Sequence, residues 1–307
     1  NSSITDWVGT CVDNPENFSN KIFDCQGHVI DGDGTGTDYG IYLYSKENNT
    51  IRNCNISEFT DGFFLYSSSN NTLFNNHAYN NSYYGFYLYS DANLNNLSNN
   101  VAYNNAVDGF RIYSNSNNNT LSSNIAYNNS KNGFSVFTNC LDNVLINNTA
   151  YNNSYDGFNI AISSSNNVVS NNTAYDNGDD GFVIYNNSNS NIVFNNTAYN
   201  NLDNGFLLYN GSNNNLTNNN AYNNGQYQIY SNSSTNNLIY NNIFNASAGQ
   251  GVVYDDGNNF WNSTKDCSGT NIIGGDCVGG NFYSDYSGVD TDGDGIGDDP
   301  PNYSIYG

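Results

Sequence analysis

The 307-residue sequence has no methionine and very few basic residues. Six Lys and Arg residues stand against 28 Asp and Glu residues, which gives a formal net charge of −22 at pH 7. A charge of this sign and size repels nucleic-acid phosphates and anionic lipid headgroups and attracts cations. The composition therefore predicts no nucleic-acid partner and no binding to a membrane surface.

Long apolar runs are also missing, and no stretch approaches the roughly 18 residues that a membrane-spanning helix needs. The sequence shows no basic start followed by an apolar segment, and it begins at Asn1 rather than at a methionine. This pattern is typical of an exported chain whose signal peptide has been removed. We expect an extracellular protein at the cell surface, without a transmembrane segment.

Cysteine is scarce but informative, because six cysteines in an exported chain predict disulfides. Cys267 and Cys277 lie close together in a glycine-rich stretch and are predicted to bond. Cys25 and Cys54 occupy matching positions of neighbouring repeats, where they either bond or merely stack, and Cys11 is an alternative partner.

About 20 Asn-x-Ser/Thr sequons also point to a compartment outside the cytosol and predict N-linked glycans. A chain so rich in Asn, Ser and Thr produces many such triplets by chance. The sites favoured for glycosylation are those in predicted bends, namely Asn80, Asn128, Asn152 and Asn232.

A repeat of about 24 residues runs through most of the chain. Residues 61–66 (DGFFLY) return as residues 84–89 (YGFYLY) and 108–113 (DGFRIY). Starting from Gly40, the repeat glycine recurs after 22 and 23 residues and then five times after 24. Two further motifs follow each glycine block, as in residues 71–76 (NTLFNN) and 78–81 (AYNN). Each repeat thus contains three short strand-like runs.

The apolar residues of Gly-Phe-x-Leu-Tyr lie two apart, which is the period of a β-strand and excludes a helical solenoid. Three strands separated by Asn-rich bends complete one circuit, so each strand lies parallel to its copy about 4.8 Å away. The sequence predicts an all-β parallel β-helix of roughly ten coils, on the order of 45 to 50 Å long. We expect a cap or joint at 1–20, the coils at 21–254, and a C-terminal cap at 255–307.

Three columns of side chains are predicted to point inward and stack from coil to coil, each buried Phe or Leu contributing roughly 1.5–3 kcal/mol. They are Phe63, Phe86, Phe110, Phe134, Phe158, Phe182 and Phe206; Leu65, Leu88, Ile112, Val136, Ile160, Ile184 and Leu208; and Ala78, Ala102, Ala126, Ala150, Ala174 and Ala198. The Asn pairs suit the bends, because Asn tolerates left-handed backbone angles and its amide can bond to the Asn one coil on.

Three stretches resemble the NosD-like parallel β-helix repeat proteins that are abundant among archaeal surface-layer and other exported archaeal proteins. They are residues 22–32 (IFDCQGHVIDG), the coils with Asn-Asn-Thr-Leu/Ile, and residues 279–298, which end in DTDGDGIGD. The resemblance implies a right-handed β-helix. That group takes its name from a copper-related periplasmic protein, but this chain offers only His28 and His77 as soft-metal candidates, so we expect no copper role.

An Asp-rich loop near the C-terminus alternates carboxylates around a glycine, which suits a hard cation such as Ca²⁺. It lacks the Glu that an EF-hand has at its twelfth position, because Pro301 stands there. The predicted calcium ligands are Asp290, Asp292, Asp294, the carbonyl of Ile296, and Asp298.

An enzyme active site is not expected from the sequence. Aspartate precedes the repeat glycine in four coils, as in Asp61 and Asp108, and such a column can be mistaken for the paired acids of a glycosidase. Asp-Gly is a common turn pair, however, and Tyr84 and Asn132 interrupt the column. A polysaccharide lyase needs clustered basic residues, whereas the six Lys and Arg residues fall on different coils.

Tyrosines also form columns, and by strand alternation several of them should face outward as a lateral contact or a sugar-stacking surface. The residues predicted to mediate assembly are Tyr79, Tyr103, Tyr127, Tyr151, Tyr175 and Tyr199, together with Tyr303 and Ile305, which would add a strand to a neighbouring copy.

The leading hypothesis is therefore a glycosylated, calcium-stabilised structural subunit that associates with itself in a filament, sheath or surface layer, and that is not an enzyme. The first alternative is an adhesin that binds cell-surface carbohydrate through its tyrosine columns. The second is a β-helix polysaccharide lyase or glycosidase, for which the sequence offers no evident set of acid, base and substrate clamp.

Overall fold

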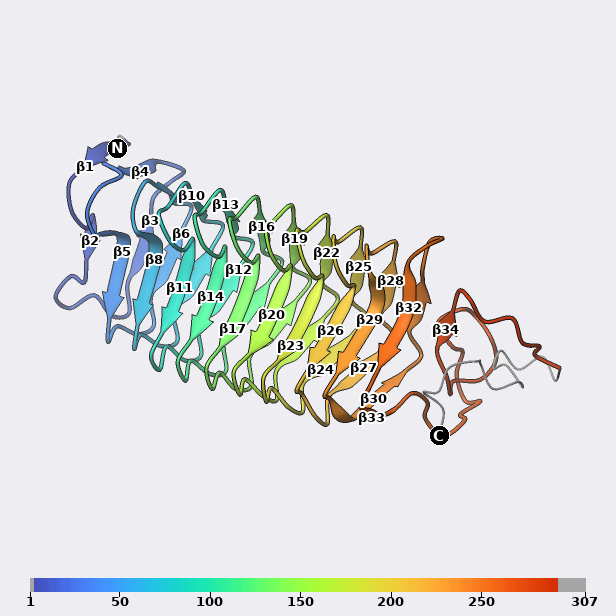
Figure 1. Ribbon diagram of the computed structural model, residues 1–307. Helices are drawn as coiled ribbons and strands as arrows, with labels where there is room; N and C mark the ends of the chain where they lie inside the picture. Colours follow the sequence, from blue (N-terminus) through green and yellow to red (C-terminus); the bar gives the residue numbers. More distant parts are fainter. Residues whose placement is uncertain (1–2, 292–307) are drawn as a thin grey trace.

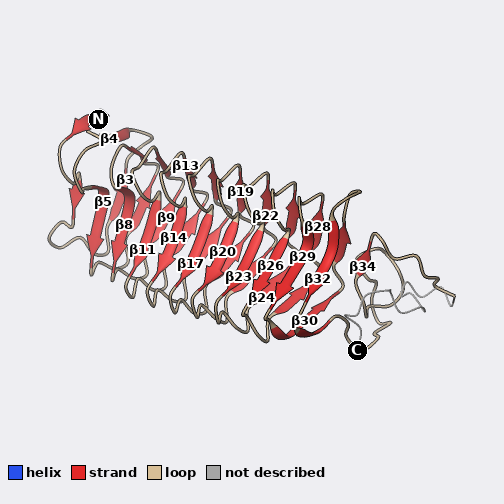
Figure 2. Cartoon of the chain, in the orientation of Figure 1, coloured by secondary structure: helices blue, strands red, loops and turns tan. Residues whose placement is uncertain are grey.

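The chain forms one solenoid of parallel strands in a computed structural model that describes residues 3–291. Its strands form three long sheets that wind around a common axis in about 11 turns, and no helix occurs among these residues (Figures 1 and 2). Consecutive strands belong to successive sheets, so each coil contributes one strand to every sheet. The predicted all-β parallel β-helix with coils of about 24 residues and three strands per coil is confirmed.

Sheet A contains the Ala-Tyr strands and its neighbours pair in parallel throughout. Its strands are β1 (Ile4–Trp7), β4 (Val29–Gly32), β7 (Asn55–Ser57), β10 (His77–Tyr79), β13 (Val101–Tyr103), β16 (Ile125–Tyr127), β19 (Thr149–Tyr151), β22 (Thr173–Tyr175), β25 (Thr197–Tyr199), β28 (Asn220–Tyr222), β31 (Ile243–Asn245) and β34 (Phe282–Tyr283).

Sheet B contains the strands that follow the repeat glycine. They are β2 (Val12–Asp13), β5 (Tyr39–Tyr44), β8 (Asp61–Tyr66), β11 (Phe86–Tyr89), β14 (Phe110–Tyr113), β17 (Phe134–Phe137), β20 (Phe158–Ala161), β23 (Phe182–Tyr185), β26 (Phe206–Tyr209), β29 (Tyr227–Asn232) and β32 (Gly251–Asp255).

Sheet C contains the third strand of each coil. Its members are β3 (Ile22–Asp24), β6 (Thr50–Arg52), β9 (Thr72–Phe74), β12 (Asn96–Ser98), β15 (Thr120–Ser122), β18 (Val144–Ile146), β21 (Val168–Ser170), β24 (Ile192–Phe194), β27 (Asn215–Thr217), β30 (Thr235–Tyr240) and β33 (Asn258–Phe260).

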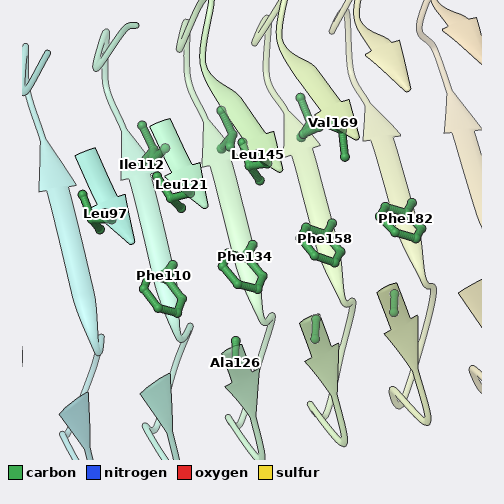
Figure 3. Close-up of a cluster of buried hydrophobic side chains, with 14 of the residues drawn as sticks. Leu97, Phe110, Ile112, Leu121, Ala126, Phe134, Leu145, Phe158, Val169 and Phe182 are labelled. Atoms are coloured by element: carbon green, nitrogen blue, oxygen red, sulfur yellow. The ribbon is translucent and has the colours of Figure 1, made fainter. Parts of the chain in front are cut away.

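The core is built from stacked columns, one or two from each sheet (Figure 3). Phe63, Phe86 and Phe110 are at most 1% exposed, and neighbouring rings in this column lie 4.6 to 4.7 Å apart with almost parallel planes. Leu121 of sheet C and Ala126 of sheet A face the same interior. The prediction that the phenylalanines stack inside the coils is confirmed, and their burial supplies the stability that a single coil lacks.

The repeat glycine is required because two coils approach closely at its position. A Cβ atom on Gly109 would lie 2.9 Å from the carbonyl oxygen of Gly133 and 3.0 Å from the Cβ atom of Ala126. Backbone oxygens cannot move away without breaking the ladder between coils. The same approach explains why sheet A carries alanine at its inward position.

Buried asparagines form a hydrogen-bonded ladder at each of the three corners. In one of them the backbone N–H and the Nδ2 of Asn100 donate to Oδ1 of Asn124 at 2.9 and 3.1 Å, and Nδ2 also donates to the carbonyl of Leu73 at 2.9 Å. Asn99, the first member of the pair, is exposed and has a φ of 54°. In each Asn pair the first residue adopts the left-handed backbone conformation of the bend, and the second places a fully hydrogen-bonded amide in the interior.

The ends of the solenoid depart from the regular coils. β1 and β2 already extend sheets A and B, while β34 is the last strand of sheet A and follows a long irregular segment (Figure 1). The assignment of residues 1–20 and 255–307 as caps or joints stays a prediction. No helix in the described part of the chain is long and apolar enough to cross a membrane.

Candidate functional site

The outward face of sheet B differs from the rest of the solenoid, because its side chains change along the rod. We call it the sheet-B face and define it by three columns, read from the N-terminal coil onward. The first column precedes the repeat glycine and holds Tyr39, Asp61, Tyr84, Asp108, Asn132, Asp156, Asp180, Asn204 and Tyr227. The second is Tyr42, Phe64, Tyr87, Arg111, Ser135, Asn159, Val183, Leu207, Tyr230 and Tyr254. The third is Tyr44, Tyr66, Tyr89, Tyr113, Phe137, Ala161, Tyr185, Tyr209 and Asn232.

Arg111 of β14 marks the centre of this face. Its Nη1 lies 2.8 Å from Oδ2 of Asp108, a carboxylate that is fully buried. The guanidinium carbon lies 5.2 Å from the ring centre of Tyr84, 4.8 Å from that of Tyr113 and 4.9 Å from that of Phe137. A cation held between a carboxylate and three rings is strongly fixed in position. Its buried Nε atom has no hydrogen-bond partner within the described chain.

A chain of polar side chains continues from Asp108 along the first column. Oδ1 of Asp108 accepts hydrogen bonds from the backbone N–H and Nδ2 of Asn132 at 3.0 and 3.1 Å. Asn132 also donates to the hydroxyl of Ser135 at 3.2 Å, and its Oδ1 accepts from the N–H of Asp156 at 3.2 Å. Nδ2 of Asn159 donates to Oδ2 of Asp156 at 2.5 Å. Adjacent coils are thus joined through side chains on the outside as well as inside.

Burial changes the acidity of the aspartates in this column. It raises the pKa of Asp61 to about 7, although a hydrogen bond from the backbone of Tyr84 opposes the shift. It also raises the pKa of Asp156 to about 7 and lifts that of Asp180 well above its ordinary value, with the charge of Asp156 adding to the latter effect. Carboxyl groups that titrate near neutrality can both donate and accept a proton, which is what general acid–base catalysis requires.

Three carboxylates converge where Asp156 and Asp180 meet Asp179 of the adjoining bend. One oxygen of each lies within 4.8 Å of the others, and Asp179 is only partly buried. Burial raises the pKa of Asp179 as well. Oxygen donors at this spacing could hold a hard cation, and without one the group is stabilised by protonation.

Aromatic rings occupy both ends of the sheet-B face. On the N-terminal side the ring of Phe64 lies 4.9 Å from that of Tyr39, 5.3 Å from that of Tyr42 and 5.0 Å from that of Tyr87. On the C-terminal side the rings of Tyr230 and Tyr254 stack at 4.4 Å. The second column therefore runs from aromatic to charged and polar and then, through the aliphatic Val183 and Leu207, back to aromatic, whereas the third column is aromatic in most coils.

The tyrosine column of sheet A is built differently. Rings from Tyr79 to Tyr222 stack at 5.0 Å with planes within 7° of parallel. In such a stack each ring face is covered by the next ring, so only ring edges and hydroxyl groups face outward. This ladder cannot offer its ring faces to a sugar, and the carbohydrate-binding role predicted for it would need another surface.

The predicted calcium loop lies almost wholly beyond the residues whose structure is described. Asp290 is exposed, while Asp292, Asp294, Ile296 and Asp298 fall outside the described residues, as do Tyr303 and Ile305 of the predicted joint. Calcium binding there stays a prediction. The four favoured glycosylation sites are all in described bends or strand ends: Asn80, Asn128 and Asn152 are exposed, and Asn232 is partly buried.

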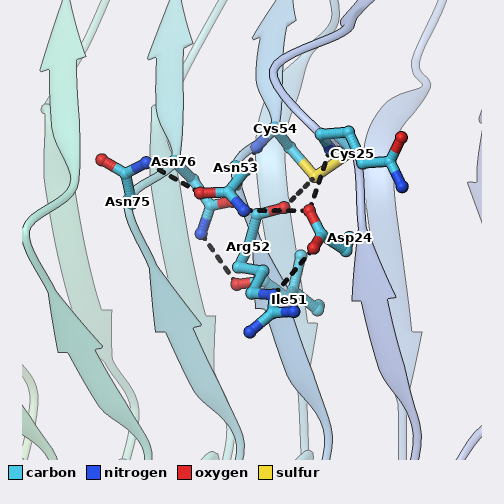
Figure 4. A network of polar contacts seen from close by, with 9 residues as sticks. Asp24, Cys25, Ile51, Arg52, Asn53, Cys54, Asn75 and Asn76 are labelled. Carbon is cyan, nitrogen blue, oxygen red and sulfur yellow. Dashed lines mark hydrogen bonds and ion pairs between the residues drawn. A yellow bond between two sulfur atoms is a disulfide. The ribbon is translucent and has the colours of Figure 1, made fainter.

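The structure pairs Cys25 with Cys54 and Cys267 with Cys277, leaving Cys11 and Cys140 as free thiols. The first disulfide links two coils beside the ion pair of Arg52 with Asp24 (Figure 4). Nearby amide side chains continue this contact, because Asn75 donates to Asn53 and Asn53 donates to Asp24.

Known proteins can now be compared with this architecture. A family model described as a right handed beta helix region matches residues 1–149, so the parallel solenoid is a right-handed β-helix. A second model, described as periplasmic copper-binding protein (NosD), matches residues 135–288, which is half of the chain. The chain belongs to the NosD family. No curated protein sequence matches the chain.

Solved structures share the fold at low sequence identity. The mannuronan C-5 epimerase AlgE6 A-module of Azotobacter vinelandii is 20% identical, with a TM-score of 0.67 over 85% of this chain and 78% of its own. The pectate lyase Pel9A is 17% identical, with a TM-score of 0.53 over 84% and 77%. A GH87 α-1,3-glucanase from Streptomyces thermodiastaticus is 14% identical, with a TM-score of 0.57 over 77% and 55%.

The prediction that the chain is not an enzyme is wrong, because the solved structures that share its fold include polysaccharide epimerases, a lyase and a glucanase. The structural reason for the error is that basic residues were judged by their scatter along the sequence. Arg111 lies alone in its coil, yet neighbouring coils supply the rings of Tyr84 and Phe137 around it.

The copper in the family description does not fit the residues of this chain. Cuprous and cupric ions prefer thiolate, thioether and imidazole donors, and the sequence has no methionine. Asn55 pairs with Val29 on one side and His77 on the other, so His28 and His77 lie two coils apart. Within the described chain, the one group of three or more candidate ligand side chains is the carboxylate cluster of Asp156, Asp179 and Asp180, which is a hard donor set.

The second column of the sheet-B face was missed because it is the variable position of Gly-Phe-x-Leu-Tyr. A repeat is recognised from residue types that recur in every coil, and no residue type recurs throughout this column. Read on its own, it runs from Tyr42 through Arg111 and Asn159 to Tyr254, and the change from aromatic to polar and back is visible in the sequence. That change is the signal that could have located the face.

Proposed function

We propose that this protein binds an extended polysaccharide along the sheet-B face and transfers protons to or from it in the segment between Asp61 and Asp156. The observation that carries the proposal is the order of side chains along the second column of this face: aromatic rings, then charged and polar groups, then two aliphatic residues and aromatic rings again. Sugar rings pack their apolar faces on aromatic side chains, and their hydroxyl groups bond to amides and carboxylates.

The central segment has the groups that proton transfer needs. Asp61 and Asp156 have pKa values of about 7, so each is present in both protonation states at neutral pH. Arg111 carries a fixed positive charge between them that can orient a polar substrate group and stabilise negative charge in a transition state. Asp61 and Asp156 lie four coils apart, on the order of 19 Å at the sheet spacing, so they cannot act together on one bond. We assign each as the general acid–base residue of a separate position along the face, and Arg111 as the electrostatic group between them.

The fold supports this proposal by analogy. The names of three solved structures with this fold describe action on mannuronan, pectate and α-1,3-glucan, all of which are polysaccharides. The three chemistries differ, so the fold alone does not select among them. The oxidised cysteine pairs and the periplasmic family description lead us to propose further that the protein works outside the cytosol.

The test is to incubate the full chain with soluble polysaccharides of different charge and linkage, and to follow binding by calorimetry and products by mass spectrometry. With a converted substrate, Asp61→Asn should lower kcat about 100-fold or more with little change in KM, because one positioned acid or base typically contributes 10²–10⁴-fold. Asp142→Asn, an exposed aspartate in the bend between β17 and β18 and outside the three columns, is the matched control. Unchanged turnover in both Asp61→Asn and Asp156→Asn would reject the assignment.

A structural role in a filament, sheath or surface layer is a second candidate, and the open ends of the solenoid favour it. β3 and β33 are the outermost strands of sheet C, and Ile22 and Phe260 on them are 69% and 56% exposed. Unpaired strand edges of this kind can add a strand from another copy. Light scattering over a range of concentrations should then reveal end-to-end growth, whereas a monomer at every concentration would exclude this role.

A further inference from the structure

The sheet-B face carries more acidic than basic groups, although Asp61 and Asp156 are only partly ionised at neutral pH. The carboxylates on it and in the bend beside it are Asp13, Asp38, Asp61, Asp108, Asp156, Asp179, Asp180, Asp203 and Asp256. The basic groups are Arg111 and Lys131, which follows Val107 in the bend column. Asp108 already offsets part of the charge of Arg111. A polymer with a carboxylate on every sugar would be repelled along most of its length.

Carboxylates also lie beside the aromatic groups at both ends of the face. Asp13 pairs with Tyr42 in the sheet, and Asp61 pairs with Tyr39. At the other end the charge of Asp256 acts on the phenol of Tyr254. An aromatic ring with a nearby carboxylate is a suitable site for an ammonium group, because the ring face and the negative charge attract the same cation.

Arg111 shows within the chain how such a site is filled. Its guanidinium lies near three rings and forms an ion pair with Asp108, so a cation bound by rings and carboxylate is already present at the centre. The three columns contain no second basic residue. The second column ends in Tyr42 and Tyr254, which each stack on one ring of the column, Phe64 and Tyr230 respectively. Each end ring therefore has a face that no further ring of the column covers, with a carboxylate nearby and without the cation that Arg111 supplies at its own site.

We propose that the polysaccharide bound by the sheet-B face is a polymer of amino sugars with free ammonium groups rather than a uronic acid polymer. This inference rests on the proposed function, since it takes the face to be a polysaccharide site and adds the charge of the ligand. The ring clusters at the two ends bind ammonium-bearing sugars, and the central acidic segment holds the sugars between them. The ion pairs between ammonium groups and carboxylates contribute to binding, and carboxyl groups that are protonated in the free protein must first lose their protons, which offsets part of that gain.

The experiment is isothermal titration of the full chain at pH 7 and physiological ionic strength with four hexasaccharides of one linkage. They are built from glucosamine, N-acetylglucosamine, glucose and glucuronic acid. We expect the glucosamine form to bind at least tenfold more tightly than the N-acetylated form, and the glucuronic acid form to bind most weakly. Because Asp61 and Asp156 are partly protonated at this pH, binding of the amine form should release protons, and the measured heat should vary with the ionisation enthalpy of the buffer.

Matched variants separate this site from simple attraction to an acidic protein. Asp13→Asn and Tyr230→Ala should each reduce the preference for the amine form several-fold, while Asp142→Asn and Tyr127→Ala, which remove the same groups elsewhere, should leave it unchanged. An equal loss in the site and control variants would overturn the inference, since the preference would then come from net charge alone.

The two proposals fail in distinguishable ways. Equal binding of the amine and N-acetylated forms, or tighter binding of the glucuronic acid form, would overturn the amino-sugar inference and leave the polysaccharide site intact. Failure of all four hexasaccharides and of longer polysaccharides to bind would overturn the proposed function itself.

Discussion

Sheets A and B have 12 and 11 strands that stack in the same coil register, yet their outward faces have opposite character. In sheet A the outward tyrosine is repeated from Tyr79 to Tyr222, and the rings stack at an almost constant 5.0 Å. In sheet B the corresponding second column changes from Phe64 to Arg111 to Asn159 to Leu207. A uniform column adds the same contact to every coil and so stabilises the whole solenoid. A column that varies while its backbone stays constant is where a particular ligand can be accommodated.

The core columns are also uniform from coil to coil, and substitutions in them are expected to change the free energy of unfolding most. Phe134 is 1% exposed and its ring stacks on Phe110 at 4.8 Å and on Phe158 at 4.7 Å. Phe134→Ala should lower the free energy of unfolding by about 3–5 kcal/mol, because it removes a large apolar side chain and leaves a cavity between fixed coils. Denaturant titration followed by circular dichroism measures this loss.

The paired control is Tyr127→Ala on the outward ladder of sheet A. It removes an aromatic ring of similar size from the same region, but the ring is partly exposed and water can fill its place. We expect a loss of about 1–2 kcal/mol, from ring stacking and partial burial. If both variants lost the same free energy, the distinction between core column and surface ladder would be wrong.

The second largest loss of stability is expected in the corner ladders, where two adjacent asparagines can be compared. Asn129 is buried, and its Nδ2 donates to Ala102 at 3.2 Å and to Asn153 at 2.9 Å, whereas Asn128 is exposed with a φ of 54°. Asn129→Asp keeps the shape but removes both donors and buries a carboxylate, so it should cost about 2–4 kcal/mol at neutral pH. Asn128→Asp should change stability by less than about 0.5 kcal/mol.

Thermal unfolding of the two asparagine variants at several pH values provides the measurement. The loss in Asn129→Asp should shrink as the pH falls, because protonation removes the buried charge. Equal melting temperatures for Asn128→Asp and Asn129→Asp would show that the ladder does not depend on the amide donors.

The fold could be predicted because its information is repeated in every coil. The glycine spacing, the strand period of Phe and Leu, and the Asn pairs each indicate the same structure many times, so one altered coil does not obscure it. Stacking of Phe63 on Phe86 and the bonding of buried Asn to the Asn one coil on both followed from that repetition. Sequence periodicity thus fixes which residues share a column.

The candidate site could be predicted only in part, because it depends on contacts between coils that differ from one another. Asp108 bonds Asn132 across 24 residues, and Arg111 contacts Phe137 of the next coil. Asp61 and Asp156 were noticed as members of a turn column, but their burial and raised pKa values arise from side chains on neighbouring coils. A pattern that averages over coils removes the differences that distinguish this face from the rest of the rod.

The smallest expected effect lies on the sheet-B face and has the opposite sign to the other two. The folded-state pKa of Asp156 is raised from 3.8 to about 7, mainly by burial. A raised acid pKa means that the folded state holds the proton more tightly than the unfolded chain does. The associated stability is fully present below about pH 4 and is lost as the pH rises towards 7. Above pH 7 the folded protein holds a buried, charged carboxylate at a cost.

Asp156→Asn should therefore stabilise the protein by about 2 kcal/mol at pH 8. One pKa unit corresponds to about 1.4 kcal/mol, and contact with water lowers the cost of the charged carboxylate below the full value of the shift. Asparagine suits this position, because Asn132 and Asn204 occupy it in other coils. In the present structure Oδ1 of Asn159 is buried and has no hydrogen-bond partner in the described chain, while its Nδ2 donates to Asp156. If the side-chain amide of Asn159 turns over, its Oδ1 can accept a hydrogen bond from the new amide at position 156. At pH 4 the stabilisation should nearly vanish, since Asp156 is then protonated in the folded state.

Guanidinium titrations at the two pH values provide the measurement, with Asp142→Asn as the exposed control. If Asp156→Asn destabilises the protein at pH 8, the carboxylate contributes to the fold rather than being kept at a cost for chemistry. If the variant is more stable but no longer converts polysaccharide, the sheet-B face is the part of the rod where stability is given up for function.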